Sequence, residues 1–150
     1  MDGVRDVLKQ AEALLRTDGV RALLVYLNGL TSHRFSAMYR FDQDDLTNLH
    51  FVDRENPDLG TCEQIPLIAS YCVFVRDSGQ LFRIDDSIAD ARVKDHAKRL
   101  EIRSYCGVPL LDGNGRMFGT ICHFDTDPIP ISGLNVAVME SIAPMLTTED

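Results

Sequence analysis

The stretch "RSYCGVPLLDGNGRMFGTICHFD", residues 103–125, decides the fold. Two apolar runs are joined by the glycine-rich segment "DGNG", residues 112–115, and this pattern predicts a β-hairpin. A hairpin with one solvent-facing side alternates polar and apolar residues, and this one hardly does. The sequence therefore predicts that other elements cover both faces of the hairpin.

A two-residue turn within 112–115 sorts the side chains onto two faces. One face then carries Tyr105, Gly107, Pro109, Phe118, Thr120, Cys122 and Phe124. The other face carries Ser104, Cys106, Val108, Leu110, Ile121 and His123. The first face mixes small and aromatic residues, which leaves room for a ligand pocket. The alternative is that a neighbouring helix fills this gap.

Helical patterns flank the sheet at both ends of the chain. Apolar residues recur at three-four spacing across residues 1–31, which predicts two N-terminal helices, and residues 133–146 form an amphipathic C-terminal helix. Alternating aromatic residues over 34–42 predict a strand, and residues 46–55 supply its hairpin partner. Hairpins make the sheet mostly antiparallel, so the terminal helices pack on one of its faces.

The middle of the chain supplies the cover for the other face. A short strand is predicted within 80–86, followed by a helix over 87–100 whose inner side carries Val93, Ala97 and Leu100. With these elements the class is α/β, of the α+β kind.

Composition excludes several functional classes. The chain has 150 residues, 45% of them hydrophobic and 25% charged, which suits one domain over residues 1–150. A net charge of −8 argues against nucleic acid and anionic membrane surfaces as partners. Neither a membrane-spanning run nor a signal peptide is expected, so a cytoplasmic location is predicted.

Cysteines and histidines give little sign of a metal site. The four cysteines, Cys62, Cys72, Cys106 and Cys122, form no CxxC pair and are expected to be buried free thiols. His33 and His50 stand near strand ends and are expected to face solvent. His123 lies in an apolar strand and is expected to be a hydrogen-bonded core histidine, with a haem ligand as the less favoured alternative.

Two motifs resemble the GAF family of small-molecule-binding sensor domains. They are "SYCGVPLLDGNGRMFGTICHFD" followed by Pro128, and "IPLIASYCVFVRDSGQLFRIDDSIADAR", residues 65–92. The resemblance implies a central antiparallel sheet of five to six strands, with the terminal helices on one face and middle helices and loops over a pocket on the other. It also places a helix at residues 69–77. GAF ligands vary widely, so neither a cofactor nor a particular ligand follows.

From this resemblance we expect a non-catalytic sensory domain that binds a small molecule. The side chains expected to face that ligand are Tyr71, Arg76, Asp85, Arg92, Tyr105, Thr120 and Cys122. A homodimer through the helices at 3–16 and 133–146 is expected, together with an output domain or protein as a further partner.

Two alternatives stay open at this point. Some GAF proteins reduce free methionine-(R)-sulfoxide, and Cys62 and Cys72 would then be the catalytic thiols. The other alternative is a structural dimerisation module whose pocket is filled by its own side chains.

Overall fold

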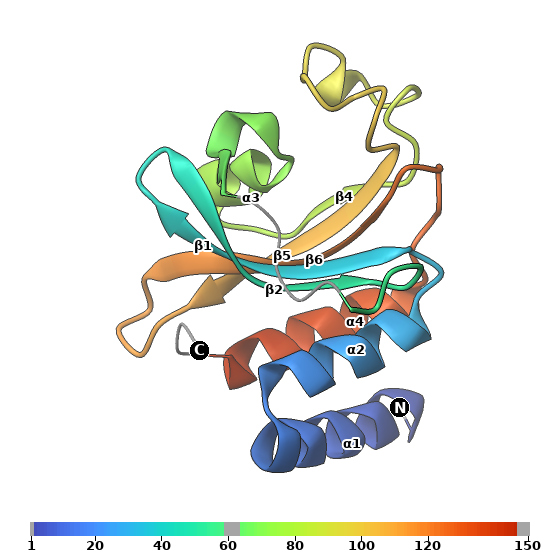
Figure 1. The fold of residues 1–150 in the computed structure, drawn as a ribbon, viewed down its shortest axis with the longest axis vertical. Helices are drawn as coiled ribbons and strands as arrows, with labels where there is room; N and C mark the ends of the chain where they lie inside the picture. Colours follow the sequence, from blue (N-terminus) through green and yellow to red (C-terminus); the bar gives the residue numbers. More distant parts are fainter. Residues whose placement is uncertain (1, 59–63, 147–150) are drawn as a thin grey trace.

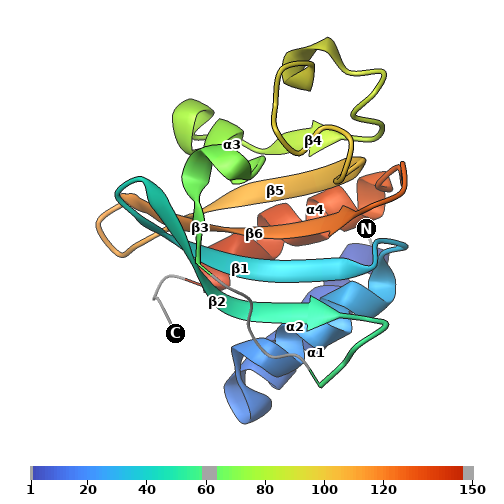
Figure 2. The same cartoon turned by 45° about the horizontal axis from the view of Figure 1, so that its top comes forward.

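The computed structural model describes residues 2–58 and 64–146. Within these ranges six strands form one sheet in the order β3-β2-β1-β6-β5-β4, as Figure 2 shows. Every pairing is antiparallel, which confirms the predicted sheet. The strands are β1 Phe35–Asp42, β2 Asp45–Asp53, β3 Ile65–Pro66, β4 Phe82–Ile84, β5 Ser104–Leu111 and β6 Met117–Asp125.

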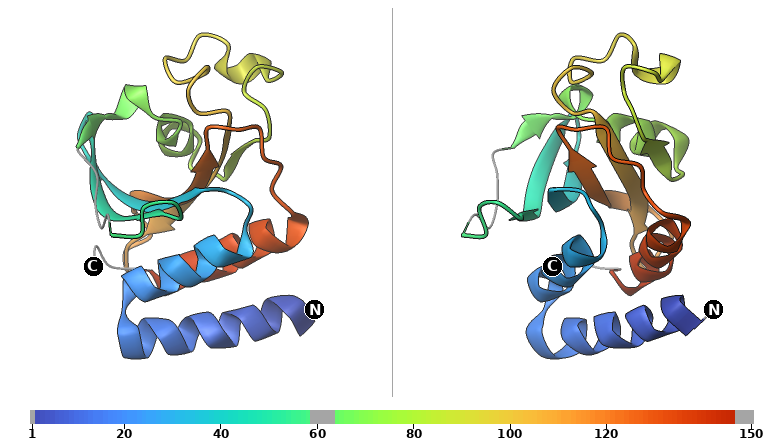
Figure 3. Two further views of the ribbon diagram at one scale, coloured as in Figure 1. Left: turned by 45° about the vertical axis from the view of Figure 1, so that its right-hand side comes forward. Right: turned by 90° about the vertical axis from the view of Figure 1, so that its right-hand side faces the viewer.

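Helices from both ends of the chain cover one face of this sheet, as expected (Figure 1). They are α1 Asp2–Asp18, α2 Val20–Leu30 and α4 Gly133–Ile142, the last continued by a short 3-10 helix over 143–145. The helices α2 and α4 lie directly on the sheet, and α1 packs on their outer side (Figures 1 and 3). In the described ranges, none of the helices combines the length and apolarity that crossing a bilayer requires.

The opposite face carries α3 Cys72–Ser78 and the long connection between β4 and β5. Ala37, Tyr39, Tyr105 and Cys122 belong to a buried cluster on this side. Met38 and Ile121, one residue away along their strands, belong to the cluster beneath α2 and α4. Both faces of the hairpin are thus covered, which explains why its two strands do not alternate polar and apolar residues.

The predicted division of the hairpin faces is confirmed except at Phe118. Pairing is regular from Tyr105 opposite Phe124 to Leu110 opposite Gly119, and the register then shifts so that Leu111 pairs with Met117. This bulge turns Phe118 onto the helical side, where it joins the cluster beneath α2 and α4. A uniform two-residue turn could not predict that shift.

The middle segment differs from expectation in two places. Residues 67–69 form a 3-10 helix and α3 begins only at Cys72, three residues later than predicted. The segment 87–100 is not a helix: it contains turns and one 3-10 helix, Ala91–Val93, and Leu100 is 77% exposed. Asp86 and Asp90 each accept a hydrogen bond from the backbone N–H two residues later, and such local bonds compete with helix formation.

The expectation for His33 is also wrong, because this side chain is 1% exposed. Its Nδ1 lies 2.6 Å from Thr31 Oγ1, and its ring stacks at 6.1 Å on that of His123. His123 is the buried, hydrogen-bonded histidine that the sequence predicts, with Nδ1 at 2.5 Å from Ser36 Oγ. His50 is half-buried. A search of the described residues finds no cluster of three side chains able to hold a metal ion.

Candidate functional site

A cavity of about 370 Å³ lies between the sheet and the layer that contains α3. Its walls are mostly aromatic and aliphatic, and it is concave in the way that small-molecule sites usually are. The lining residues are Phe35, Tyr39, Phe51, Ile65, Ala69, Ser70, Tyr71, Lys98, Glu101, Ile102, Tyr105, Cys122, Phe124 and Thr126.

Three neighbouring strands build an aromatic floor on the sheet side. The Phe35 ring in β1 stacks on Phe124 of β6 at 5.0 Å between centroids and on Phe51 of β2 at 5.7 Å. The period-two repeat of a strand places Phe35 and Tyr39 on the same side of β1, so both face the cavity. The alternation that predicts a strand at 34–42 therefore also supplies the floor.

Tyr71 fixes the opposite wall, just before α3 begins. Its hydroxyl donates a hydrogen bond of 2.9 Å to the backbone oxygen of Ile102, which joins α3 to the segment before β5. The ring meets Tyr105 edge-on at 5.7 Å between centroids, and the half-buried His96 lies 4.6 Å away. These contacts fix the position of the Tyr71 ring in the wall of the cavity.

The described lining of the cavity contains two charged side chains, and they are paired with each other. Lys98 Nζ and Glu101 Oε2 form an ion pair of 2.9 Å, and both side chains are partly exposed at the rim. The remaining lining side chains carry no formal charge. The site therefore suits a molecule that is largely apolar, with a polar end directed to the rim.

Cys72, the first residue of α3, is fully buried where α3 packs on β6 and has unusual surroundings for a buried thiol. Tyr105 Oη donates a hydrogen bond of 3.1 Å to its sulfur, and Thr120 Oγ1 lies at 3.3 Å. Burial raises the pKa of the Cys72 thiol, but hydrogen bonds from Cys122 and from three neighbouring hydroxyl groups outweigh this and lower the pKa to about 7. Burial raises the pKa of Tyr105 well above its usual value, so its hydroxyl keeps its proton.

Three of the seven residues expected to face a ligand line the cavity: Tyr71, Tyr105 and Cys122. Thr120 is fully buried beside Cys72, with Oγ1 at 3.3 Å from its sulfur, and is not among the lining residues. Of the two alternative catalytic cysteines, Cys72 is fully buried at the start of α3, and Cys62 lies outside the described residues.

The other three expected residues lie away from the cavity and have local partners. Arg76 pairs with the adjacent Asp77 at 3.2 Å. Asp85 pairs with Arg83 at 3.1 Å, two residues away. Arg92 pairs with Asp90 at 2.6 Å, and its guanidinium lies 4.6 Å from the centroid of the Phe82 ring. None of these three charged side chains is among the described residues that line the cavity.

Several lining residues were missed from the sequence. Phe35 and Tyr39 could have been found, because they alternate on β1, which pairs directly with β6. Lys98 and Glu101 could not, because Lys98 stands in the segment that the sequence predicts as a helix and Glu101 directly follows it, and the irregular path of this segment brings both to the rim.

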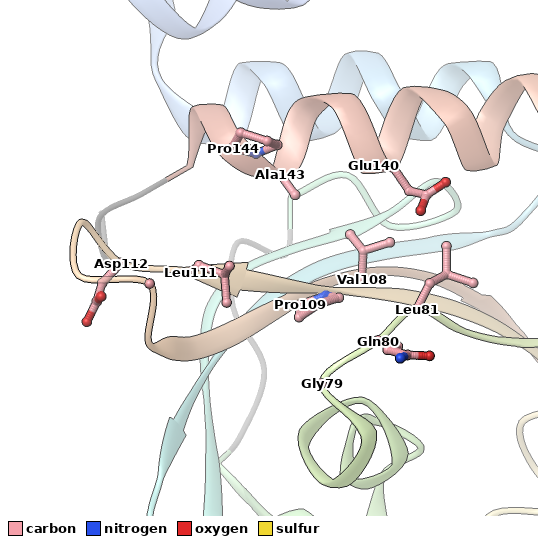
Figure 4. A pocket seen from close by; sticks show the side chains of 11 residues that line it. Gly79, Gln80, Leu81, Val108, Pro109, Leu111, Asp112, Glu140, Ala143 and Pro144 are labelled. Atoms are coloured by element: carbon pink, nitrogen blue, oxygen red, sulfur yellow. The ribbon is translucent and has the colours of Figure 1, made fainter.

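A second hollow, of about 620 Å³, lies on the helical side at the edge of the sheet (Figure 4). Val108 and Leu81 on the sheet side face Ala143 and Glu140 on the helix side. It is larger than the aromatic cavity but is lined by the C-terminal helix and by hairpin residues, without aromatic rings or a buried polar group among its described lining. We therefore take the aromatic cavity as the candidate site.

The antiparallel sheet, its helical cover on one face and the aromatic cavity on the other define an α+β domain. The model of the GAF domain family matches residues 3–149, and the chain belongs to this family.

Solved structures share the fold at low identity. The GAF domain of an Acinetobacter phosphoenolpyruvate-protein phosphotransferase superposes with a TM-score of 0.76 at 12% identity, covering 96% of this chain and 90% of that one. A free methionine-R-sulfoxide reductase of Neisseria meningitidis, solved with its substrate, gives a TM-score of 0.76 at 19% identity over 97% of this chain and 87% of that one. At such identities the likeness shows the fold alone.

One curated relative is similar in sequence. A cyclic di-GMP phosphodiesterase of Pseudomonas aeruginosa is 29% identical over 87 residues, which cover 55% of this chain. The match covers 15% of the length of that relative.

Proposed function

We propose that this chain is a non-catalytic sensory GAF domain whose ligand occupies the aromatic cavity. The observation that carries the proposal is the cavity itself, about 370 Å³ enclosed by aromatic side chains of three strands and by Tyr71. This volume is at the lower end of the range of small-molecule sites. The alternative in which the chain's own side chains fill the pocket has less support, because this space stays open between the rings.

The ligand class follows from the lining. Stacked rings offer flat apolar surfaces, and the only charged groups among the described lining residues are the paired Lys98 and Glu101. Burying a phosphate without a cationic partner would cost several kcal/mol, on the order of the penalty for an unpaired ion. We therefore propose a small neutral aromatic compound, with or without a polar end at the rim, rather than a nucleotide.

The test uses two neighbouring residues of one 3-10 helix. Ala69 lines the cavity, whereas Ile68 beside it is 74% exposed. We expect indole and p-cresol to raise the melting temperature of the wild-type protein and cyclic AMP to leave it unchanged. The Ala69→Phe variant should lose the response because its ring occupies the cavity, and Ile68→Phe should keep it.

Two results would count against a binding function. One is a wild-type protein that responds to none of these probes and carries no bound small molecule in native mass spectrometry. The other is an equal response in the Ala69→Phe and Ile68→Phe variants, which would place binding elsewhere.

We further propose that the domain acts together with an output domain or protein. Support comes from the phosphodiesterase relative, of which the match covers 15% of the length. A homodimer through the helical layer belongs to the same proposal, since dimerisation would bring two output partners together.

Reduction of free methionine-(R)-sulfoxide is the second candidate, favoured by the Cys72 thiol and its lowered pKa. Against it stands the complete burial of Cys72. Incubation with methionine-(R)-sulfoxide and a thiol reductant discriminates the two functions. The sensory proposal predicts no methionine from the wild type, whereas the reductase predicts methionine that disappears in the Cys72→Ser and Cys62→Ser variants.

A further inference from the structure

Two free cysteines, Cys72 and Cys122, lie together where α3 packs against β6. Both are fully buried, and Cys122 forms part of the cavity floor. A cysteine that serves only as a small apolar group needs no polar neighbours. The Cys72 sulfur nevertheless has Tyr105 Oη at 3.1 Å and Thr120 Oγ1 at 3.3 Å, in addition to the Cys122 thiol.

The contact between Tyr105 Oη and the Cys72 sulfur depends on a glycine in β5. Tyr105 and Gly107 stand on the same side of the strand, and a Cβ atom at Gly107 would come within 2.2 Å of Tyr105 Oη. Any residue other than glycine would therefore push the hydroxyl away from Cys72. The small residue that the sequence suggested as room for a ligand is room for this hydrogen bond.

Cys106 provides an internal comparison on the same strand. It stands next to Tyr105 but faces the helical side, where it belongs to the apolar cluster with Val108 and Ile121. Burial raises the pKa of Cys106 to about 12. The pKa of the Cys72 thiol is thus lowered and that of the Cys106 thiol is raised. A lowered pKa favours the reactive thiolate, whereas a raised pKa leaves the thiol inert.

We propose that Cys72 and Cys122 are a redox-active pair that a small hydroperoxide such as hydrogen peroxide, which is little larger than water and far smaller than methionine sulfoxide, converts into a disulfide. In the first step the Cys72 thiolate attacks the peroxide; the O–O bond breaks, an S–O bond forms, and hydroxide or alkoxide leaves and takes up a proton. In the second step the Cys122 sulfur attacks the Cys72 sulfenic acid; the S–S bond forms and water leaves with the Cys122 proton. The two cysteines together lose two electrons, which the peroxide gains.

The disulfide would change the floor of the aromatic cavity without any ligand present. It ties α3 to β6 and weakens the acceptor for the Tyr105 hydroxyl, whose pKa is already raised by burial. Oxidation can be measured in the ligand-free protein, so its outcome is distinguishable from the outcome of the binding test.

The experiment uses the full chain with Cys62→Ser, so that Cys72, Cys106 and Cys122 are the thiols that remain. After treatment with hydrogen peroxide near neutral pH, peptide mapping should find the peptides of Cys72 and Cys122 linked and Cys106 reduced. In the Cys122→Ser variant, dimedone should trap a sulfenic acid at Cys72, because the thiol that would resolve it is gone.

A rate comparison separates the proposed role of Tyr105 from general packing. The Tyr105→Phe variant keeps the ring but removes the hydroxyl. We expect oxidation of Cys72 near neutral pH to slow about fivefold, the effect on the thiolate fraction of raising a pKa of about 7 by about one unit. Tyr26→Phe removes a hydroxyl from α2 on the other side of the sheet and should leave the rate unchanged.

Three results would overturn the proposal. The first is that Cys72 and Cys122 both stay reduced under peroxide, or react no faster than Cys106. The second is that Cys72 reaches the sulfinic acid while Cys122 remains a free thiol. The third is an equal rate in the Tyr105→Phe and Tyr26→Phe variants, which would remove the hydroxyl from the mechanism.

Discussion

His123 shows how burial of a single ionisable group links folding to pH. The side chain is 2% exposed, and burial lowers its pKa to about 3, with smaller contributions from His33 and Arg54. The folded protein therefore holds a neutral imidazole, whereas the unfolded chain takes up a proton near its ordinary pKa. Folding is favoured above that ordinary pKa, and the advantage is lost as pH falls toward the folded-state value.

We predict that the free energy of unfolding falls by about 2 kcal/mol between about pH 7.5 and pH 5. Carboxylates with lowered pKa values, such as Asp53, affect stability only at more acidic pH, so this window reports on histidine. Urea unfolding across the window measures the slope, and the His123→Gln variant should flatten it. An unchanged slope in that variant would show that His123 does not govern the pH dependence.

The sequence predicts the positions of the strands better than it predicts which individual side chains reach the cavity. Arg76, Asp85 and Arg92 have the chemistry of ligand contacts, but each finds an oppositely charged neighbour within two residues. Tyr105 and Cys122 could be placed because a regular antiparallel register puts them on the same face of one hairpin. Residue type therefore predicts a binding role poorly unless strand periodicity fixes the direction of the side chain.

At the scale of elements, α1 is bound to the rest of the protein by a narrow apolar stripe. Ala11 is fully buried, and Val7, Leu8 and Leu15 pack against the same cluster as α2 and α4. The apolar side of α1 is therefore covered within one chain. A dimer is therefore not needed to keep this stripe away from water.

We predict that Ala11→Glu undocks α1 or destabilises the whole fold. A carboxylate at this position has no room and no water, so the free energy of unfolding should fall by about 2–4 kcal/mol. Gln10→Glu adds the same charge to the next, exposed position and should change stability by less than about 0.5 kcal/mol. Urea unfolding followed by circular dichroism measures both, and equal stabilities would contradict the packing of α1.

Elements with regular periodicity could be predicted from the sequence, and those shaped by local side-chain bonds could not. The strands and terminal helices follow from alternation and from three-four spacing. The segment 87–100 contains apolar residues at helical spacing, but Asp86, Asp90 and His96 each bind a backbone N–H two residues later. The charged pair at the rim of the candidate site, Lys98 and Glu101, lies at the end of this segment and directly after it, so it was missed for the same reason.

At the scale of the whole molecule, the outer surface of the helical layer is where we expect self-association. A shallow hollow between α1 and α4 is lined by Val4, Leu8 and Ala137, with charged residues around it. At the start of α4, Leu134 is 48% exposed. These residues leave some apolar surface on the outer side even though the main stripe of α1 is covered.

We predict a concentration-dependent dimer that Ala137→Glu weakens at least about tenfold, the effect of about 1.4 kcal/mol at an apolar contact. Leu100→Glu changes an apolar residue that is 77% exposed on the other side of the sheet and should leave the dimer intact. Sedimentation velocity of the three proteins measures this. A wild-type protein that stays monomeric at the highest concentration would remove the dimer from the proposed function.

The sheet is a single layer of strands, so neighbouring residues of one strand pack on opposite faces. Along β6, Ile121 points into the helical layer, Cys122 reaches the aromatic floor, and His123 again points to the helical side. The same stretch of β6 backbone therefore carries side chains of the helical layer and side chains of the aromatic cavity. We expect that a displacement of β6 caused by contacts on one side of the sheet would strain the contacts of the same strand on the other side.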